Sequence, residues 1–82
     1  MNENELFELV KRHIIDVVPT VEPEQVVLSA VLANLGANSV DRADIISDAL
    51  DELDLPVPFT EFFGLRTVGE IVERLHVARP VG

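Results

Sequence analysis

The hydrophobic positions of this 82-residue chain recur at a helical period in three separate stretches. In the first stretch, residues 3–18, apolar side chains lie three or four positions apart, and charged side chains fill positions between them. The apolar set is Leu6, Phe7, Val10, Ile14 and Val17. This spacing predicts an amphipathic helix. The helix ends before Pro19, because proline disfavours helical backbone at the residue that precedes it.

The second stretch, residues 39–53, predicts another amphipathic helix. Ile45 and Ala49 widen an apolar stripe whose main members share the helical period. These are Val40, Ala43, Ile46, Leu50 and Leu53. Pro56 and Pro58 follow the helix and fix an extended turn, because the proline ring restricts the backbone and removes the N–H donor.

Two shorter segments complete the helical pattern. Residues 59–63 predict one helical turn, ended by Gly64, that carries three aromatic side chains toward the core: Phe59, Phe62 and Phe63. Thr67 is placed to cap a last helix that runs to about His76. The inward side chains of that helix are Val68, Ile71, Val72 and Leu75. Residues 78–82 predict a frayed tail.

The long connection between the first two helices, residues 20–38, has little polar content for its length. It is therefore expected to pack on the core rather than to extend into solvent. Its inward side chains are predicted to be Leu28, Val31, Leu32 and Leu35. No stretch alternates in the manner of a strand. The pattern predicts an all-α fold, a small four-helix bundle with three longer helices, one short helix and a long first loop, in a single domain over residues 1–82.

The charge balance narrows the range of partners. Six basic and fifteen acidic residues leave a net charge of −9, and the pI is near 4.4. Such a surface repels nucleic acid and anionic membranes, so we expect neither as a partner, whereas it attracts basic patches on other proteins. The same charge can also serve solubility alone. Self-repulsion favours a monomer.

Cysteine is absent, which excludes a disulfide scaffold and is typical of a cytoplasmic protein. The first residues carry no basic region followed by an apolar run, so we expect no signal peptide, and no apolar stretch is long enough to span a membrane. His13 and His76 lie on different predicted helices without nearby ligand clusters, so we expect no metal site. Neither is placed to activate Ser39, so no catalytic residue is predicted.

Ser39 has the most informative surroundings. A serine at a helix start ordinarily caps the helix. Here Asn38 can take that role, with Asp41 three residues later as in a capping box. Ser39 then stands in the first helical turn with its hydroxyl free and pointing to solvent. A phosphodiester at that point lies near the positive end of the helix dipole, so the local physics permits a modified serine without requiring one.

The order of elements and the residues around this serine resemble the acyl carrier protein family. The motif is read from Leu35, Gly36, Ala37, Asn38, Ser39 and Val40. In that family the serine is esterified by 4′-phosphopantetheine, whose thiol carries an acyl group as a thioester. The resemblance implies that Ser39 is the attachment residue and that a phosphopantetheinyl transferase is a partner. Asn38 replaces the usual aspartate, which removes one negative charge, and Val40 replaces the usual leucine.

Residues 36–42 also resemble the discrete donor carrier proteins of polyketide β-branching cassettes, where a Gly-Ala-Asn-Ser-x-Asp-Arg pattern recurs. In those systems the carrier offers an acetyl or propionyl group to an enzyme similar to hydroxymethylglutaryl-CoA (HMG-CoA) synthase. The resemblance therefore implies that this synthase-like enzyme, an acyltransferase, or both are partners. The alternatives left open are a general extension carrier of fatty-acid or polyketide synthesis and an unmodified acidic interaction module.

Four aspartates form one stripe of the second predicted helix, with Glu52 beside it: Asp41, Asp44, Asp48 and Asp51. Like charges at this spacing repel, by a few tenths of a kcal/mol per pair. The stripe is either a solvated polar face or a docking face for basic partners, and the neighbouring serine motif favours docking. The partner-binding surface is predicted to comprise Asn38, Val40, Asp41, Arg42, Asp44 and Asp48. Arg42 could pair with nearby carboxylates or help one partner discriminate this carrier from others.

Overall fold

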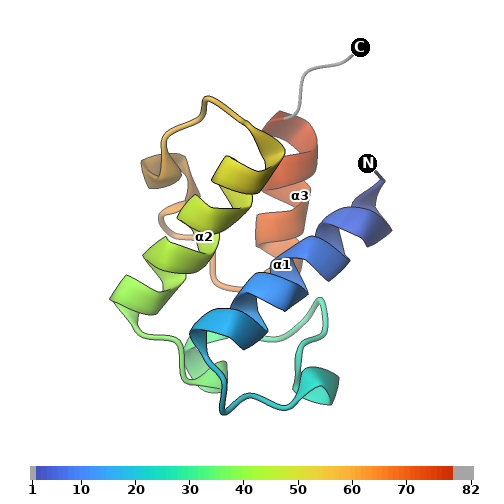
Figure 1. Ribbon diagram of the computed structural model, residues 1–82, viewed down its shortest axis with the longest axis vertical. Helices are drawn as coiled ribbons and strands as arrows, with labels where there is room; N and C mark the ends of the chain where they lie inside the picture. Colours follow the sequence, from blue (N-terminus) through green and yellow to red (C-terminus); the bar gives the residue numbers. More distant parts are fainter. Residues whose placement is uncertain (1, 79–82) are drawn as a thin grey trace.

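The computed structural model describes residues 2–78, and over that range the chain is built from three α-helices and three short 3₁₀ helices. Their order is α1 (Glu3–Val17), η1 (Pro23–Gln25), η2 (Leu32–Leu35), α2 (Ser39–Leu53), η3 (Phe59–Phe62) and α3 (Val68–Ala78). Helix α1 packs against both α2 and α3, and η3 packs against α2. Figure 1 shows the long connection from α1 to α2 gathered at one end of these helices. The predicted all-α fold is confirmed, with the fourth, short helix in 3₁₀ form.

Helix α1 begins where the sequence supplies a reciprocal cap. The Glu5 N–H donates to Asn2 Oδ1 at 2.8 Å, and the Asn2 N–H donates back to the Glu5 carboxylate at 3.0 Å. These bonds satisfy backbone donors that have no acceptor inside the helix. The helix ends at Val17, just before Pro19, as predicted.

The core is wholly apolar over the described residues, where no polar or charged residue is classed as buried. Each α-helix contributes its inward stripe. The most completely buried side chains of the three α-helices include Leu6, Ile14, Ile45, Ile71 and Leu75. Burial of apolar area, at roughly 25 cal/mol per Å², is therefore the main force that holds the helices together.

The long connection packs on the core, but partly through other residues than predicted. Leu32 is fully buried, as expected, whereas Leu28 is 55% exposed. The reason is that the backbone around Leu28 joins the start of α3: the Gly69 N–H donates to the Leu28 carbonyl at 2.8 Å, and the Val68 N–H donates to the Ala30 carbonyl at 3.0 Å. The buried side chains of this connection that the sequence did not predict are Val21, Val26 and Ala37.

The inward face of α2 is rotated relative to the predicted stripe. Ile45 and Ala49, which were expected only to widen the stripe, are buried with Ile46 and Leu50. Val40 was placed in the stripe but is 68% exposed. It lies in the first turn, beside Ser39, and at roughly 3.6 residues per turn it is about 140° around the helix from Ile45, so it points away from the buried face of α2.

The prediction that η3 carries three aromatic side chains into the core is wrong for two of them. Phe62 is 1% exposed, but Phe59 and Phe63 are 37% and 67% exposed. Four residues of 3₁₀ helix make little more than one turn, so one side chain reaches the core and the others stay at the surface. The rings of Phe59 and Phe63 meet edge to face, with centroids 5.5 Å apart, and each covers part of the other.

Helix α3 starts at the predicted cap. The Glu70 N–H donates to Thr67 Oγ1 at 3.1 Å, and the Glu70 carboxylate accepts from the backbone N–H groups of Arg66 and Thr67. These donors, Arg66 first, hold the pKa of Glu70 below its ordinary value. The helix extends to Ala78, beyond its predicted end at His76. The rest of the predicted tail, residues 79–82, lies outside the described residues.

Candidate functional site

Ser39 is the first residue of α2 and is exposed, and the capping role belongs to its neighbour. The Asp41 N–H donates to Asn38 Oδ1 at 2.8 Å, and the Asn38 N–H donates to the Asp41 carboxylate at 3.3 Å. The predicted capping box is confirmed. The Ser39 side chain is therefore not required to complete the helix start.

A tight turn fixes where α2 begins. Gly36 ends η2 with φ +95°, a left-handed backbone that side chains with a Cβ rarely adopt. Ala37 is buried, and its N–H donates to the Leu32 carbonyl at 3.2 Å. Leu32 is itself fully buried. Ser39 is thus held at the surface by a turn that is anchored in the core on its N-terminal side.

The hydroxyl oxygen of Ser39 is not free, contrary to the prediction. Arg42 Nη2, one helical turn away, donates a hydrogen bond to Ser39 Oγ at 3.3 Å. Over residues 2–78 the ion pairs are those of Arg12 and His13 with Glu52, so Arg42 pairs with no carboxylate in that range. The spacing of three residues on one helix could have indicated this contact from the sequence.

A groove of about 300 Å³ opens beside Ser39, with a mainly apolar lining. On the α2 side its wall includes Ser39, Arg42 and Ala43, and on the opposite side it includes Phe59 and Phe63. The two phenylalanines that fail to enter the core thus line this groove. An extended chain attached at Ser39 has an apolar surface within reach.

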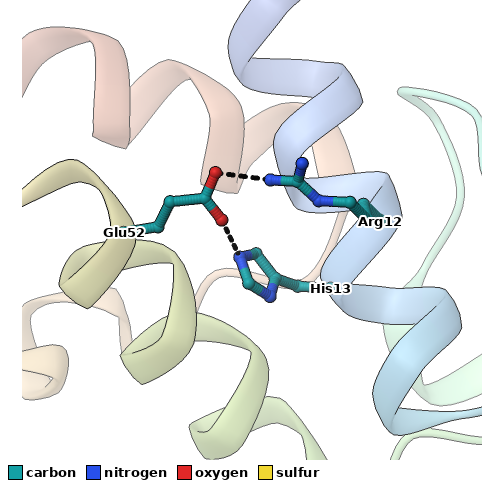
Figure 2. Close-up of polar contacts among 3 residues, drawn as sticks. All are labelled: Arg12, His13 and Glu52. Atoms are coloured by element: carbon teal, nitrogen blue, oxygen red, sulfur yellow. Dashed lines mark hydrogen bonds and ion pairs between the residues drawn. The ribbon is translucent and has the colours of Figure 1, made fainter.

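The acidic residues divide into two groups. Asp44, Asp48 and Asp51 are exposed on α2, whereas Glu52 faces α1. Glu52 accepts a hydrogen bond from Arg12 and contacts His13 Nε2 at 2.8 Å (Figure 2). The Arg12 guanidinium is the main cause that holds the pKa of Glu52 below its ordinary value. Glu52 therefore joins two helices, a role that the sequence pattern did not indicate because its partners lie some forty residues away.

Two further properties bear on the class of protein. Across residues 2–78, no three His, Cys, Asp or Glu side chains are grouped so that they could hold a metal ion. Within the same range, every helix is too short or too polar to cross a bilayer. The candidate site is an exposed serine at the start of a helix, contacted by an arginine and next to an apolar groove.

Comparisons with known proteins identify this arrangement. The sequence model of the family described as "Phosphopantetheine attachment site" matches residues 8–75. The polyketide biosynthesis acyl-carrier-protein AcpK of Bacillus subtilis is 36% identical over 76 residues, which cover 93% of each chain. An acyl carrier protein of Thermosynechococcus vestitus is 34% identical over 74 residues, covering 89% of this chain and 90% of the relative.

A solved structure gives the same result. The chain superposes with a TM-score of 0.86 and 26% identity, over 94% of its own length and 99% of the other chain, on a chain from the crystal structure of the curacin biosynthetic pathway HMG synthase in complex with acetyl donor-ACP. The protein described here belongs to the acyl carrier protein family. It is a carrier of 4′-phosphopantetheine and not an enzyme. This family assignment excludes the alternative of an unmodified interaction module.

Proposed function

We propose that Ser39 is the residue to which 4′-phosphopantetheine is attached. The observation that carries this proposal is that Ser39 is exposed at the start of α2 while Asn38 performs the capping. A phosphopantetheinyl transferase joins the arm to Ser39 Oγ from coenzyme A. The new Oγ–P bond replaces the pyrophosphate P–O bond, the adenosine bisphosphate leaves, and the hydroxyl proton passes to a base of the transferase.

The surroundings of Ser39 favour the product of this reaction. A phosphodiester is anionic, and the first turn of a 15-residue helix presents N–H groups that lack intrahelical acceptors together with the positive end of the dipole. The net charge of −9 acts against a further anion, and the helix start is the part of α2 where that cost is smallest. The apolar groove beside Ser39 gives the arm or its cargo a surface on which to rest.

The cargo we propose is an acetyl or propionyl thioester, which the carrier presents to an HMG-CoA-synthase-like enzyme in polyketide β-branching. Three observations support this: the Gly-Ala-Asn-Ser-x-Asp-Arg pattern of residues 36–42, the similarity to a polyketide carrier and the similarity to a chain of an acetyl donor complex. A two- or three-carbon acyl group also needs little shelter, and the groove beside Ser39 has a volume of about 300 Å³.

The docking surface surrounds Ser39 on α2. Val40, 68% exposed, supplies an apolar contact, and the exposed carboxylates of Asp44 and Asp48 supply attraction to basic partner surfaces. Asn38, Asp41 and Arg42 complete the surface on the side of the helix start. The transferase, an acyltransferase and the synthase-like enzyme would use it in turn, with the carrier as a monomer in the cytoplasm and without nucleic acid or membrane.

The experiment that tests the donor role compares two carriers charged with the same acetyl group. This protein and a general fatty-acid acyl carrier protein are each incubated with an HMG-CoA-synthase-like enzyme, and acetyl transfer is followed by the masses of carrier and enzyme. We expect transfer from this protein to be at least about tenfold faster. Equal rates of acetyl transfer from the two carriers would contradict the proposal that this protein is a dedicated acetyl donor.

A second function, that of a general extension carrier, is favoured by one observation. The relatives from Thermosynechococcus vestitus and from Clostridium perfringens, the latter 32% identical over 68 residues, are described simply as acyl carrier proteins. This function predicts efficient malonyl loading and chain extension. A rate of malonyl loading and chain extension higher than the rate of acetyl donation to the synthase-like enzyme would favour the general extension carrier.

A further inference from the structure

We infer that Arg42 is a positioning residue that holds the phosphodiester of the arm and directs the arm along the groove beside α2. The inference rests on the proposed attachment at Ser39. Its basis is the contact between Arg42 Nη2 and Ser39 Oγ at 3.3 Å, together with the position of both side chains on the same wall of the groove.

The guanidinium of Arg42 is available for an anion. The carboxylate nearest in sequence, Asp41, accepts the Asn38 N–H in the capping box. The ion pairs found over the described part of the chain involve Glu52 and the α1 side chains Arg12 and His13. Among residues 2–78, the Arg42 guanidinium donates one hydrogen bond, to the Ser39 hydroxyl, although a guanidinium has five N–H donors in a fork that matches phosphate oxygens.

The phosphate group would form within reach of this fork. Phosphorus bonds to Ser39 Oγ, the atom that Arg42 already contacts, so the two non-bridging oxygens lie two bonds beyond Oγ. These oxygens carry the negative charge, whereas the esterified Oγ loses most of its ability to accept. A small rotation of the guanidinium replaces its hydrogen bond to an uncharged hydroxyl oxygen with hydrogen bonds to anionic phosphate oxygens, so that an ion pair is formed as well.

The contact of Arg42 with Ser39 also sets the direction in which the arm leaves Ser39. Arg42 is partly buried against the groove, and the opposite wall is formed by the rings of Phe59 and Phe63. A phosphate fixed on the Arg42 side starts the arm toward these rings rather than away into solvent. Because the holding contact is a surface ion pair, a basic group on a partner can compete for the phosphate and release the arm.

The test compares Arg42→Gln with Arg42→Lys and with Arg74→Gln, which removes the same charge from an exposed position on α3. Each protein is converted completely to the phosphopantetheine form, and intact mass confirms the loading before anything else is measured. Phosphorus-31 NMR then reports the environment of the phosphodiester, and nitrogen-15 relaxation of a labelled arm reports its order.

In the parent protein and in Arg74→Gln we expect a phosphorus resonance displaced from that of the same phosphodiester in urea-unfolded protein, with a displacement that shrinks as salt is raised. In Arg42→Gln the displacement and its salt dependence should disappear and the arm should become as mobile as in solution. Arg42→Lys should fall between them, because it keeps the charge without the fork. Spectra of Arg42→Gln that match the parent would overturn the inference and leave the attachment intact, whereas a parent protein that takes up no arm would remove the proposed attachment itself.

Discussion

Arg12 on α1 donates to the carboxylate of Glu52 on α2, across forty residues of sequence, and this pair links two helices whose buried side chains are apolar. Both side chains are about half exposed, so solvent screens their attraction. Figure 2 shows His13 reaching the other oxygen of the same carboxylate. The three side chains bear on the fold, and they lie away from the serine that starts α2.

The acid stability of the protein should depend on Glu52. The pKa of this carboxyl is lowered from 4.5 on folding, chiefly by the hydrogen bond from Arg12. A group with a depressed folded pKa stabilises the fold above its unfolded pKa, and that stabilisation disappears as pH falls through the folded value. Urea unfolding at about pH 7 and about pH 3 should therefore show a larger loss in the parent protein than in Glu52→Gln. Glu73→Gln, which changes an exposed carboxyl on α3, is the matched control and should behave like the parent. If Glu52→Gln lost as much unfolding free energy as the parent, Glu52 would not be the source of the pH dependence.

Variants of Asn38 and Ser39 should separate the residue that caps α2 from the residue that is modified. Asn38→Ala removes the acceptor for the Asp41 N–H and should lower the free energy of unfolding by about 1 kcal/mol. Asn38→Asp keeps an acceptor and should cost less. Ser39→Ala should change the free energy of unfolding by less than about 0.5 kcal/mol, since the hydroxyl caps nothing. If Ser39→Ala destabilised the protein as much as Asn38→Ala, the capping box would not be the relevant structure.

The turn before Ser39 should tolerate only residues that accept a positive φ. A Cβ at Gly36 would meet Val18 at 3.7 Å, an ordinary contact, so the cost of Gly36→Ala comes from the backbone at φ +95°. We expect a loss of about 1–2 kcal/mol and slower loading by the transferase, because the turn sets the position of Ser39. Gly36→Asn should recover part of both, since asparagine enters this region more readily. Unfolding by urea and loading followed by mass measure the two effects.

Phe62 and Phe63 should differ sharply in their contribution to the free energy of unfolding. Phe62→Ala removes a ring that is 1% exposed and should cost about 3–5 kcal/mol. Phe63→Ala removes a ring that is 67% exposed and should cost less than about 1 kcal/mol. Urea unfolding of the two variants distinguishes them, and similar losses would mean that the groove wall is part of the core.

The acidic face of α2 should govern encounter with basic partners. Charge reversal in Asp44→Lys or Asp48→Lys should slow loading by a phosphopantetheinyl transferase, by roughly tenfold at low salt, and should flatten its salt dependence. Asp16→Lys makes the same change at an exposed position of α1 and serves as control. Loading rates that are the same for all three variants would show that the charges on α2 serve only solubility.

The bounds of α2 and its cap could be predicted from sequence because both depend on local features: the helical period, Asn38 and Asp41. The face of α2 that turns inward could not be predicted, since it depends on where α1 and η3 lie. Val40 was therefore assigned to the wrong side of the helix. The partners of Glu52 were missed for the same reason. At the site, the motif predicts Ser39, whereas its contact with Arg42 was not predicted, although a separation of three residues on one helix permits it.

The most direct test of the account is the intact mass of the protein after incubation with coenzyme A and a broad-specificity phosphopantetheinyl transferase. Ser39→Ala is compared with Ser29→Ala, which removes another exposed serine. We predict a gain of one phosphopantetheine in the parent and in Ser29→Ala, and none in Ser39→Ala. Loading of Ser39→Ala, or no loading of any of the three, would contradict the assignment of Ser39 as the attachment residue.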